Sequence, residues 1–152
     1  MPLEQPPLPR ESIQCSISAA VEYQVPANLM LAIVQKEGGK PGLISRNKNG
    51  TADLGPMQFN TAYLQDLAKY GITQKDVLGS GCYPFHLAAW RIRGHLQNDK
   101  GDIWTRAANW HSRTPSKNAA YRNDMLKKAE KWGQWLATHY QTHVYRDAYA
   151  TR

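Results

Sequence analysis

The strongest constraint in this sequence is a short, mostly apolar run that ends in a carboxylate. The run spans residues 29–36 and is followed by Glu37 and two glycines. With helical periodicity, Glu37 lies on the same face as Met30 and Ile33, which is the face that a folded domain buries. The two glycines predict the end of the helix, because glycine adopts a positive φ at little cost. The run therefore predicts a buried helix with a carboxyl group at its C-terminus.

This placement has a chemical consequence for Glu37. Burial disfavours the ionised form of a carboxyl group, and the negative end of the helix dipole disfavours it further. We therefore expect the pKa of Glu37 to be raised, so that the group can donate a proton near neutral pH. Glu37 is the candidate general acid of the chain.

Length and charge limit the kind of protein that this chain can be. The 152 residues suffice for one domain with a substantial core, and a second domain is not expected. The net charge of +7 predicts attraction to an acidic partner, such as nucleic acid, an anionic membrane face or a cell-wall polymer. Because lysine and arginine form no block of five or six, an ordinary solvated surface is the simpler explanation of the charge.

Neither a membrane span nor a signal peptide is expected in this chain. No apolar stretch approaches the roughly 18 to 20 residues that cross a bilayer, and the first residues lack the apolar core of a signal peptide. Residues 1–10 contain four prolines and predict a flexible lead.

The two cysteines, Cys15 and Cys82, lack metal-ligand spacing. They form either one disulfide or two buried thiols, and we favour the disulfide. A metal site is not indicated.

Helical periodicity accounts for most of the chain. The pattern and its caps predict helices over residues 11–23, 26–37, 61–70, 84–97, 103–110 and 119–140, with a helical turn after Thr73. Between residues 40 and 54 the pattern disappears, and Asn49-Gly50 allows at most a short β-hairpin. Residues 141–152 predict a polar tail. The expected fold is mainly α: a compact helical domain over residues 11–140 with a long loop beside Glu37.

Three stretches in this order resemble one known family. They are KEGGKPG around Glu37, then LGPMQFN, then NWHSRTP near residue 110. A helix ending in a lone Glu, a Gly-x-Met-Gln segment and a Tyr-Asn-Ala-Gly-like turn are similar to soluble lytic transglycosylase domains, which are related to goose-type lysozyme. The loop NKNGTADLGPMQFNT and a paired cysteine most resemble the small specialised transglycosylases of conjugation, type IV secretion and pilus systems. The resemblance covers roughly residues 12–130 and implies a lysozyme-like fold.

The resemblance implies an enzyme that cuts peptidoglycan without a cofactor. Such enzymes cleave the β-1,4 bond between N-acetylmuramic acid and N-acetylglucosamine and leave 1,6-anhydromuramoyl ends, with one Glu acting as acid and then as base. The lone candidate Glu37 agrees with this, because most glycosidases need two carboxylates. The implied partners are glycan strands and a secretion, conjugation or pilus machine. We expect a monomer that does not bind nucleic acid. The implied location is the periplasm or the cell exterior, where a disulfide persists.

Several further positions match the family's cleft. Met57 and Gln58 match its Met-Gln pair, which implies contacts with sugar or acetamido groups, although Met57 alone would fit a core equally well. Gly55 implies a close approach of backbone and substrate. The residues expected to bind substrate are Asp53, Gly55, Met57, Gln58, Asn60, Trp110, His111 and Tyr121.

Two departures from the family pattern leave the assistance to Glu37 open. Gly38 replaces the serine that often follows the catalytic Glu, and Trp110 stands where the family has a tyrosine. Tyr121 could supply the missing phenol or pack in the core. Trp110 similarly allows stacking on a sugar or a core role, and His111 either tunes the acid or is structural.

Three other functions are compatible with parts of this pattern. A lysozyme-type hydrolase of the same fold would need a second carboxylate, for which Asp53 is the candidate, although Asp in such a loop is more often a hydrogen-bond acceptor. A non-catalytic peptidoglycan-binding or scaffold domain would account for Gly38 and Trp110. A nucleic-acid binder has only the net charge in its favour, because no helix gathers the basic residues.

Overall fold

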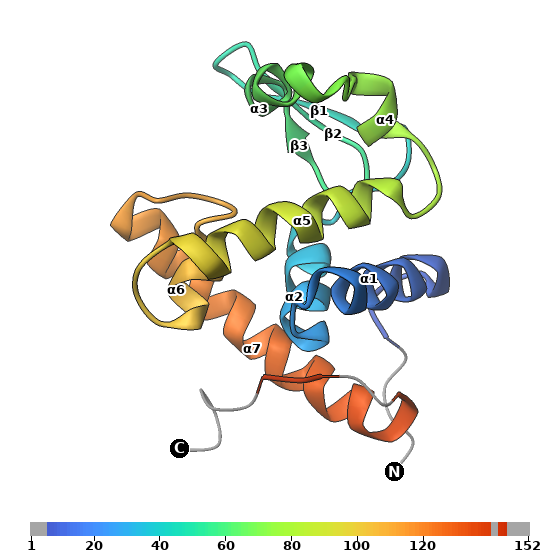
Figure 1. The fold of residues 1–152 in the computed structure, drawn as a ribbon, viewed down its shortest axis with the longest axis vertical. Helices are drawn as coiled ribbons and strands as arrows, with labels where there is room; N and C mark the ends of the chain where they lie inside the picture. The colour runs from blue at the N-terminus through green and yellow to red at the C-terminus, as the bar shows by residue number, and fades with distance from the viewer. Residues whose placement is uncertain (1–5, 141–142, 146–152) are drawn as a thin grey trace.

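A buried central helix, α2, organises the fold. The computed structural model describes residues 6–140 and 143–145. Helix α2 spans Ala27–Glu37, and every residue from Ala27 to Val34 is buried. It packs against α1 (Arg10–Tyr23) and α7 (Pro115–His139), while α5 (Tyr83–Asn98) crosses in front of it in Figure 1. A helix surrounded in this way must be apolar on nearly all sides, which accounts for the run at residues 29–34.

Of the two helices that follow α5, the first begins where it was predicted and the second begins earlier. Helix α6 spans Ile103–Ala108, packs against α5 and α7, and begins after Asp102, whose carboxylate accepts the backbone N–H of Thr105. Helix α7 begins at Pro115, four residues before the predicted start. The prediction treated Pro115 as part of a loop, but proline fits the first turn of a helix because its missing N–H has no partner there.

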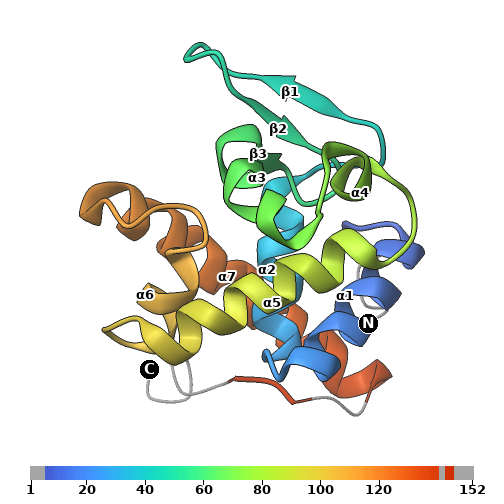
Figure 2. The same cartoon turned by 45° about the horizontal axis from the view of Figure 1, so that its top comes forward.

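A small antiparallel sheet stands beyond α5, on the side away from α7 (Figures 1 and 2). Its strands are β1 (Ile44–Arg46), β2 (Ala52–Leu54) and β3 (Phe59–Asn60), in the order β1-β2-β3. The predicted hairpin is therefore present, but the limit of two strands was wrong, since Phe59 pairs with Leu54 in a third strand. Two residues are too few to show an alternating pattern in the sequence.

Short helices cover one side of this sheet. They are α3 (Thr61–Leu67), a 3₁₀ turn (Ala68–Tyr70) and α4 (Gln74–Leu78). Asn60 caps α3, and the predicted helical turn after Thr73 is α4, where Thr73 forms a capping box with Asp76. The mainly helical domain predicted from the sequence is thus the observed architecture, with the sheet and its helices forming a second, smaller layer.

The predicted disulfide is present. Cys15 on α1 is bonded to Cys82, which directly precedes α5, with 4.9 Å between the two Cα atoms. The bond fixes α1 to the start of the helix that crosses the domain. None of the helices in the described ranges is long and apolar enough to cross a membrane.

The predicted lead and tail lie partly outside the described residues. Of the tail, residues 143–145 contact the start of α2: the Ala27 N–H donates to the His143 carbonyl at 2.9 Å. The Asn28 side chain donates to the Tyr145 carbonyl at 2.9 Å and accepts the Tyr145 N–H at 3.0 Å. The domain limits at residues 11 and 140 stay a prediction, while regular helix begins at Arg10 and ends at His139.

Candidate active site

Glu37 is the last residue of α2 and lies at the boundary between core and surface. Gly38 follows in the left-handed conformation (φ 62°), and its N–H donates to the Val34 carbonyl, which closes the helix. The side chain of Glu37 is partly buried, as its helical position predicts. The glycine at position 38 is therefore explained by the helix end, where a positive φ is needed.

Two donors from distant segments converge on one oxygen of Glu37. The Trp110 indole Nε1–H donates to Glu37 Oε1 at 2.9 Å, and the Tyr121 hydroxyl donates to the same atom at 3.0 Å. Trp110 follows α6 and Tyr121 lies in the second turn of α7. No hydrogen bond from a described residue reaches the other oxygen, Oε2. The carboxyl group thus has one anchored oxygen and one oxygen left for a ligand.

The surroundings raise the pKa of Glu37, as the sequence predicts. Burial is the main cause, and the negative charge of Asp53 acts in the same direction. The hydrogen bonds from Trp110 and Tyr121 and the charge of Lys36 oppose the rise without cancelling it. Burial beside Glu37 also raises the pKa of Tyr121 well above its usual value, so the phenol stays protonated and acts as a donor.

The ring of Tyr121 is held by its neighbours. Lys36 Nζ lies 4.6 Å from its centre and forms an ion pair with Asp124 at 2.6 Å, and the His111 ring stacks on it at 4.6 Å. The pKa of His111 is lowered by its burial and by the positive charges of Lys36 and Lys117, which favours a neutral imidazole. Through this stacking His111 contacts Tyr121, which donates to Glu37.

Trp110 is also fixed by packing. Its ring meets Phe59 edge to face, with 5.5 Å between the ring centres, and the Arg91 guanidinium lies 4.8 Å from its centre. Only 5% of Trp110 and 7% of Tyr121 is exposed. For Tyr121 the two roles that the sequence left open are thus combined, because its ring is buried and its hydroxyl binds Glu37. Trp110 is a buried ring that binds Glu37, and its stacking on a sugar stays a prediction.

The glycines of the loop bring backbone segments into direct contact. A Cβ atom at Gly39 would lie 2.2 Å from the Gly55 carbonyl oxygen, and one at Gly55 would lie 2.0 Å from the Val77 carbonyl oxygen. The side of Gly55 on which a Cβ would lie faces Val77 in α4, and its approach to the substrate stays a prediction. Met57 is fully buried, so its thioether belongs to the core and does not line an open surface.

The polar residues of the loop bind one another. The Gln58 amide donates to the Gly55 carbonyl at 2.9 Å, and Gln58 adopts a positive φ of 53°. Asn60 donates to Asp53 at 3.0 Å, and Asn47 donates to the other oxygen of Asp53 at 3.3 Å. These bonds hold the loop beside Glu37 together, and the predicted contacts of Asp53, Gln58 and Asn60 with substrate stay a prediction.

A cavity of about 820 Å³ opens beside Trp110. It lies between α3, α5 and the segment that joins α6 to α7, and its wall contains Tyr63, Arg91, His95, Asp99, His111 and Arg113. Of these, only His111 was predicted as a site residue. A signal for Arg91 existed, because it lies three residues after Ala88 and four after Leu87 on the apolar face of α5.

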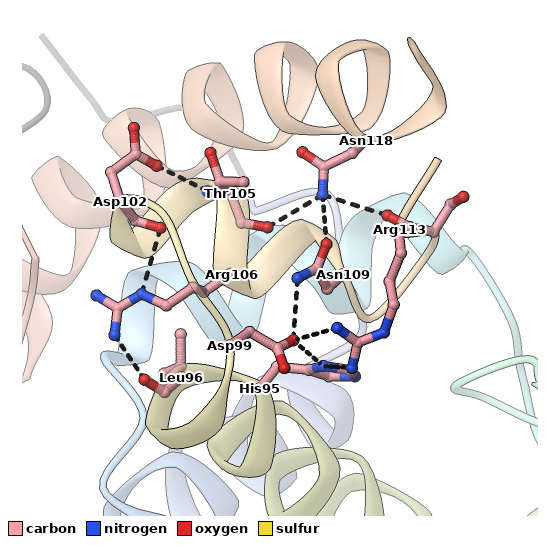
Figure 3. A network of polar contacts seen from close by, with 10 residues as sticks. His95, Leu96, Asp99, Asp102, Thr105, Arg106, Asn109, Arg113 and Asn118 are labelled. Atoms are coloured by element: carbon pink, nitrogen blue, oxygen red, sulfur yellow. Dashed lines mark hydrogen bonds and ion pairs between the residues drawn. The ribbon is translucent and has the colours of Figure 1, made fainter. Parts of the chain in front are cut away.

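One side of this cavity is held in place by a polar network (Figure 3). Asp99 accepts hydrogen bonds from Asn109 at 2.9 Å and from His95 Nδ1 at 2.6 Å, and it forms an ion pair with Arg113 at 3.1 Å. Asn118 at the start of α7 donates to Asn109 at 2.8 Å. The network joins α5, α6 and α7, so the cavity wall is rigidly connected to the helix that carries Tyr121.

No cluster of three or more His, Cys, Asp or Glu residues that could hold a metal ion occurs within residues 6–140 and 143–145. The site consists of a carboxyl group and two neutral donors, and the polar cavity lies next to it without Glu37 in its wall. Chemically, this arrangement can transfer a proton to and from a bound oxygen.

Comparisons with known proteins match this part of the chain. The family model of the transglycosylase SLT domain matches residues 14–132. The invasion protein IagB of Salmonella typhimurium is 30% identical over 115 residues, which cover 75% of this chain and 71% of that protein. Protein IpgF of Shigella flexneri is 27% identical over 117 residues, covering 76% of this chain and 74% of that protein.

The matched span contains the whole site around Glu37, from the helix that carries the acid to the helix that carries Tyr121. The expected family is therefore confirmed by a match over most of the sequence, and the chain is a member of the transglycosylase SLT family.

Proposed function

We propose that this protein is a peptidoglycan lytic transglycosylase with Glu37 as its single acid and base. It would cleave the β-1,4 bond between N-acetylmuramic acid and N-acetylglucosamine and form 1,6-anhydromuramoyl ends. The observation that carries the proposal is the pair of hydrogen bonds from Trp110 and Tyr121 to Oε1 of a partly buried Glu37 with a raised pKa.

These hydrogen bonds determine where the acidic proton resides. An indole N–H can only donate, and the Tyr121 phenol stays protonated, so Oε1 acts as an acceptor in both states of Glu37. The proton of the neutral acid is therefore carried by Oε2. This is the oxygen that can reach the glycosidic oxygen of a bound strand.

The same oxygen serves both halves of the reaction. In the first half the proton passes from Oε2 to the glycosidic oxygen as the bond from that oxygen to C1 of the muramoyl residue breaks. In the second half the C6 hydroxyl of that residue attacks C1, the new C1–O6 bond closes the anhydro ring, and Oε2 takes the hydroxyl proton. No water is consumed, and Glu37 returns to its protonated state.

The balance of forces on Glu37 suits this double role. Burial favours the neutral acid, which is needed at the start. The hydrogen bonds from Trp110 and Tyr121 strengthen when the group becomes a carboxylate, since bonds to a charged acceptor are roughly twice as strong as neutral ones. A general acid that must later act as a base needs a pKa close to the working pH.

Asp53 supports this mechanism over a hydrolytic one that uses two carboxylates. Its two oxygens accept hydrogen bonds from Asn60 and Asn47, and its charge raises the pKa of Glu37. Asp53 thus acts on Glu37 through its charge, and its own oxygens are engaged in the loop.

The biological setting is proposed on separate grounds. A disulfide between Cys15 and Cys82 suits the periplasm or the cell exterior, where peptidoglycan is accessible. We propose that the enzyme opens the wall locally for a secretion, conjugation or pilus apparatus. The loop resemblance supports this role, as does the name of the relative IagB as an invasion protein.

The test is product analysis of purified sacculi by liquid chromatography and mass spectrometry. Wild type should release muropeptides with 1,6-anhydromuramoyl ends, and Glu37→Gln should release none. Glutamine is a matched control, because its carbonyl oxygen can still accept the bonds from Trp110 and Tyr121. Reducing ends would instead identify a muramidase, and equal release by both proteins would remove Glu37 from the mechanism.

A further inference from the structure

The cavity beside Trp110 contains a cation in an unusual setting. The guanidinium carbon of Arg91 lies 3.9 Å from the ring centre of Tyr63 and 4.8 Å from that of Trp110. Arg91 thus contacts the same indole that donates to Glu37 Oε1. Neither ring forms a hydrogen bond with the guanidinium, so these contacts leave its N–H groups able to donate to a ligand.

These N–H groups lack a protein acceptor in the described part of the chain. The negative charges of Glu37 and Asp66 stabilise the cation and the positive charge of Arg113 opposes it, but none of the three forms a hydrogen bond or an ion pair with Arg91. Burial lowers the pKa of Arg91, which reflects partial loss of water around the cation. A partly desolvated cation without a hydrogen-bonded anion is costly, and an anionic ligand would remove that cost.

Apart from Asp66, the other charged groups named in the wall of the cavity are engaged with described residues. Asp99 is bound by Asn109, His95 and Arg113 (Figure 3), so it does not neutralise Arg91. Arg93, on the same helix, donates to the Gln24 carbonyl at 3.3 Å. Asp66 lines the cavity without forming an ion pair to a described residue. Among the described arginines that line the cavity, Arg91 is therefore the one without a hydrogen bond or an ion pair.

We infer that Arg91 is a carboxylate-binding residue, and that it holds an acidic group attached to the muramoyl residue beside the bond that is cut. A ligand on Arg91 lies one indole ring away from Glu37, because Trp110 contacts both residues. The inference rests on the proposed function, since a muramoyl residue carries a free carboxylate on its lactyl group. When a stem peptide is joined to the lactyl group, the free carboxylates are those of the peptide. Planar guanidinium and carboxylate groups pair through two parallel hydrogen bonds.

A positioning role through Trp110 is the competing explanation for Arg91. In that case loss of Arg91 would alter Trp110 and hence Glu37, and kcat and its pH profile would change for every substrate. A carboxylate-binding role predicts instead a loss of binding that is confined to ligands with a free carboxylate.

The test measures binding by calorimetry in the full chain carrying Glu37→Gln, which prevents turnover. The first ligand pair is the GlcNAc-MurNAc disaccharide with a free lactyl carboxylate and the same disaccharide with that carboxylate amidated. The second pair is the disaccharide tripeptide with free or amidated peptide carboxylates. The pair that shows the preference identifies the source of the bound carboxylate.

We expect the free carboxylate to bind at least about tenfold more tightly than its amide, as a charge-assisted hydrogen bond implies. Adding Arg91→Gln should bring this ratio close to one, and Arg91→Lys should keep part of it. Arg93→Gln is the matched control, because it removes the same charge from the same cavity and should leave the ratio unchanged.

The inference would be overturned if the ratio of the two affinities were close to one in the Glu37→Gln protein, or if neither ligand bound. It would also be overturned if Arg93→Gln lowered this ratio as much as Arg91→Gln. Anhydro products without a carboxylate preference would refute the role of Arg91 alone. A preference without anhydro products would refute the proposed reaction alone. Because the ligand pairs are compared within one protein, a variant that folds poorly does not decide the result.

Discussion

The hydrogen bond from Tyr121 to Glu37 can be removed by deleting one oxygen atom. Tyr121→Phe keeps the buried ring and its stacking on His111 but leaves Oε1 with Trp110 as its one remaining donor. Since this bond lowers the pKa of Glu37, its loss should raise that pKa further. Trp110→Phe should act in the same direction.

The magnitude follows from the difference between the charged and neutral forms of the acceptor. A hydrogen bond to a charged group contributes about 1.5–3 kcal/mol, and roughly half of that remains when the acceptor is neutral. The bond from Tyr121, at 3.0 Å, is therefore expected to favour the carboxylate over the acid by about 1 kcal/mol. Because one pKa unit corresponds to 1.36 kcal/mol, its removal should raise the pKa of Glu37 by about half a unit to one unit.

The direct assay is a ¹³C NMR titration of the Glu37 side-chain carboxyl in wild type and variant. The alkaline limb of the pH profile of sacculus solubilisation should move upward by the same amount, because the reaction starts from the protonated acid. Trp132→Phe is the matched control: Trp132 donates to the neutral Gln35 side chain at 3.0 Å, two residues before Glu37 on the same helix. An unchanged or lowered pKa in Tyr121→Phe would refute the role assigned to this bond.

Three further predictions concern stability. Burial raises the pKa of Glu37 in the folded protein above 4.5, so ionisation of Glu37 destabilises the fold increasingly as the pH rises from 4.5 through the folded pKa. Glu37→Gln should therefore raise Tm at pH 7 but not at pH 3. An equal gain in Tm at both pH values would contradict this. Gly39→Ala places a Cβ 2.2 Å from a carbonyl oxygen and should lower the free energy of unfolding, measured by urea denaturation, by about 2–3 kcal/mol or more. Gly94→Ala, in open space within α5, should raise it by about 0.5–1 kcal/mol. Replacing Cys15 and Cys82 by serine should cost about 4 kcal/mol in the same assay, given their separation of 67 residues, and a change below 1 kcal/mol would contradict the entropic estimate.

The environment of Glu37 could be predicted from the sequence because it follows from local periodicity. Helical spacing fixes which residues share a face, and the glycines fix where the helix ends. The donors could not be assigned in this way, since Trp110 and Tyr121 lie 73 and 84 residues away from Glu37. A single sequence shows that each is a large ring at helical spacing, which fits a core position as well as a site.

The roles of Gly55 and Arg91 depend in the same way on tertiary structure. The sequence predicts that Gly55 allows a close approach, but the approaching group, the Val77 carbonyl, is decided by the packing of α4. Arg91 falls on an apolar face, and only the positions of Tyr63 and Trp110 make it a stacked cation. The third strand was missed because Phe59 and Asn60 alone show no periodicity.

The contacts between loop backbones also have a consequence for motion. Gly39 lies against Gly55, which lies against Val77, and the Gly42 and Gly55 N–H groups donate to the carbonyls of Leu78 and Leu43, both at 2.8 Å. Chain segments joined in this way open together or not at all, although their conformation is irregular. We expect the amide hydrogens of Gly42 and Gly55 to exchange with solvent as slowly as those in the short helices nearby. The wall beside Glu37 would then be a fixed template, to which a flexible glycan strand must adapt.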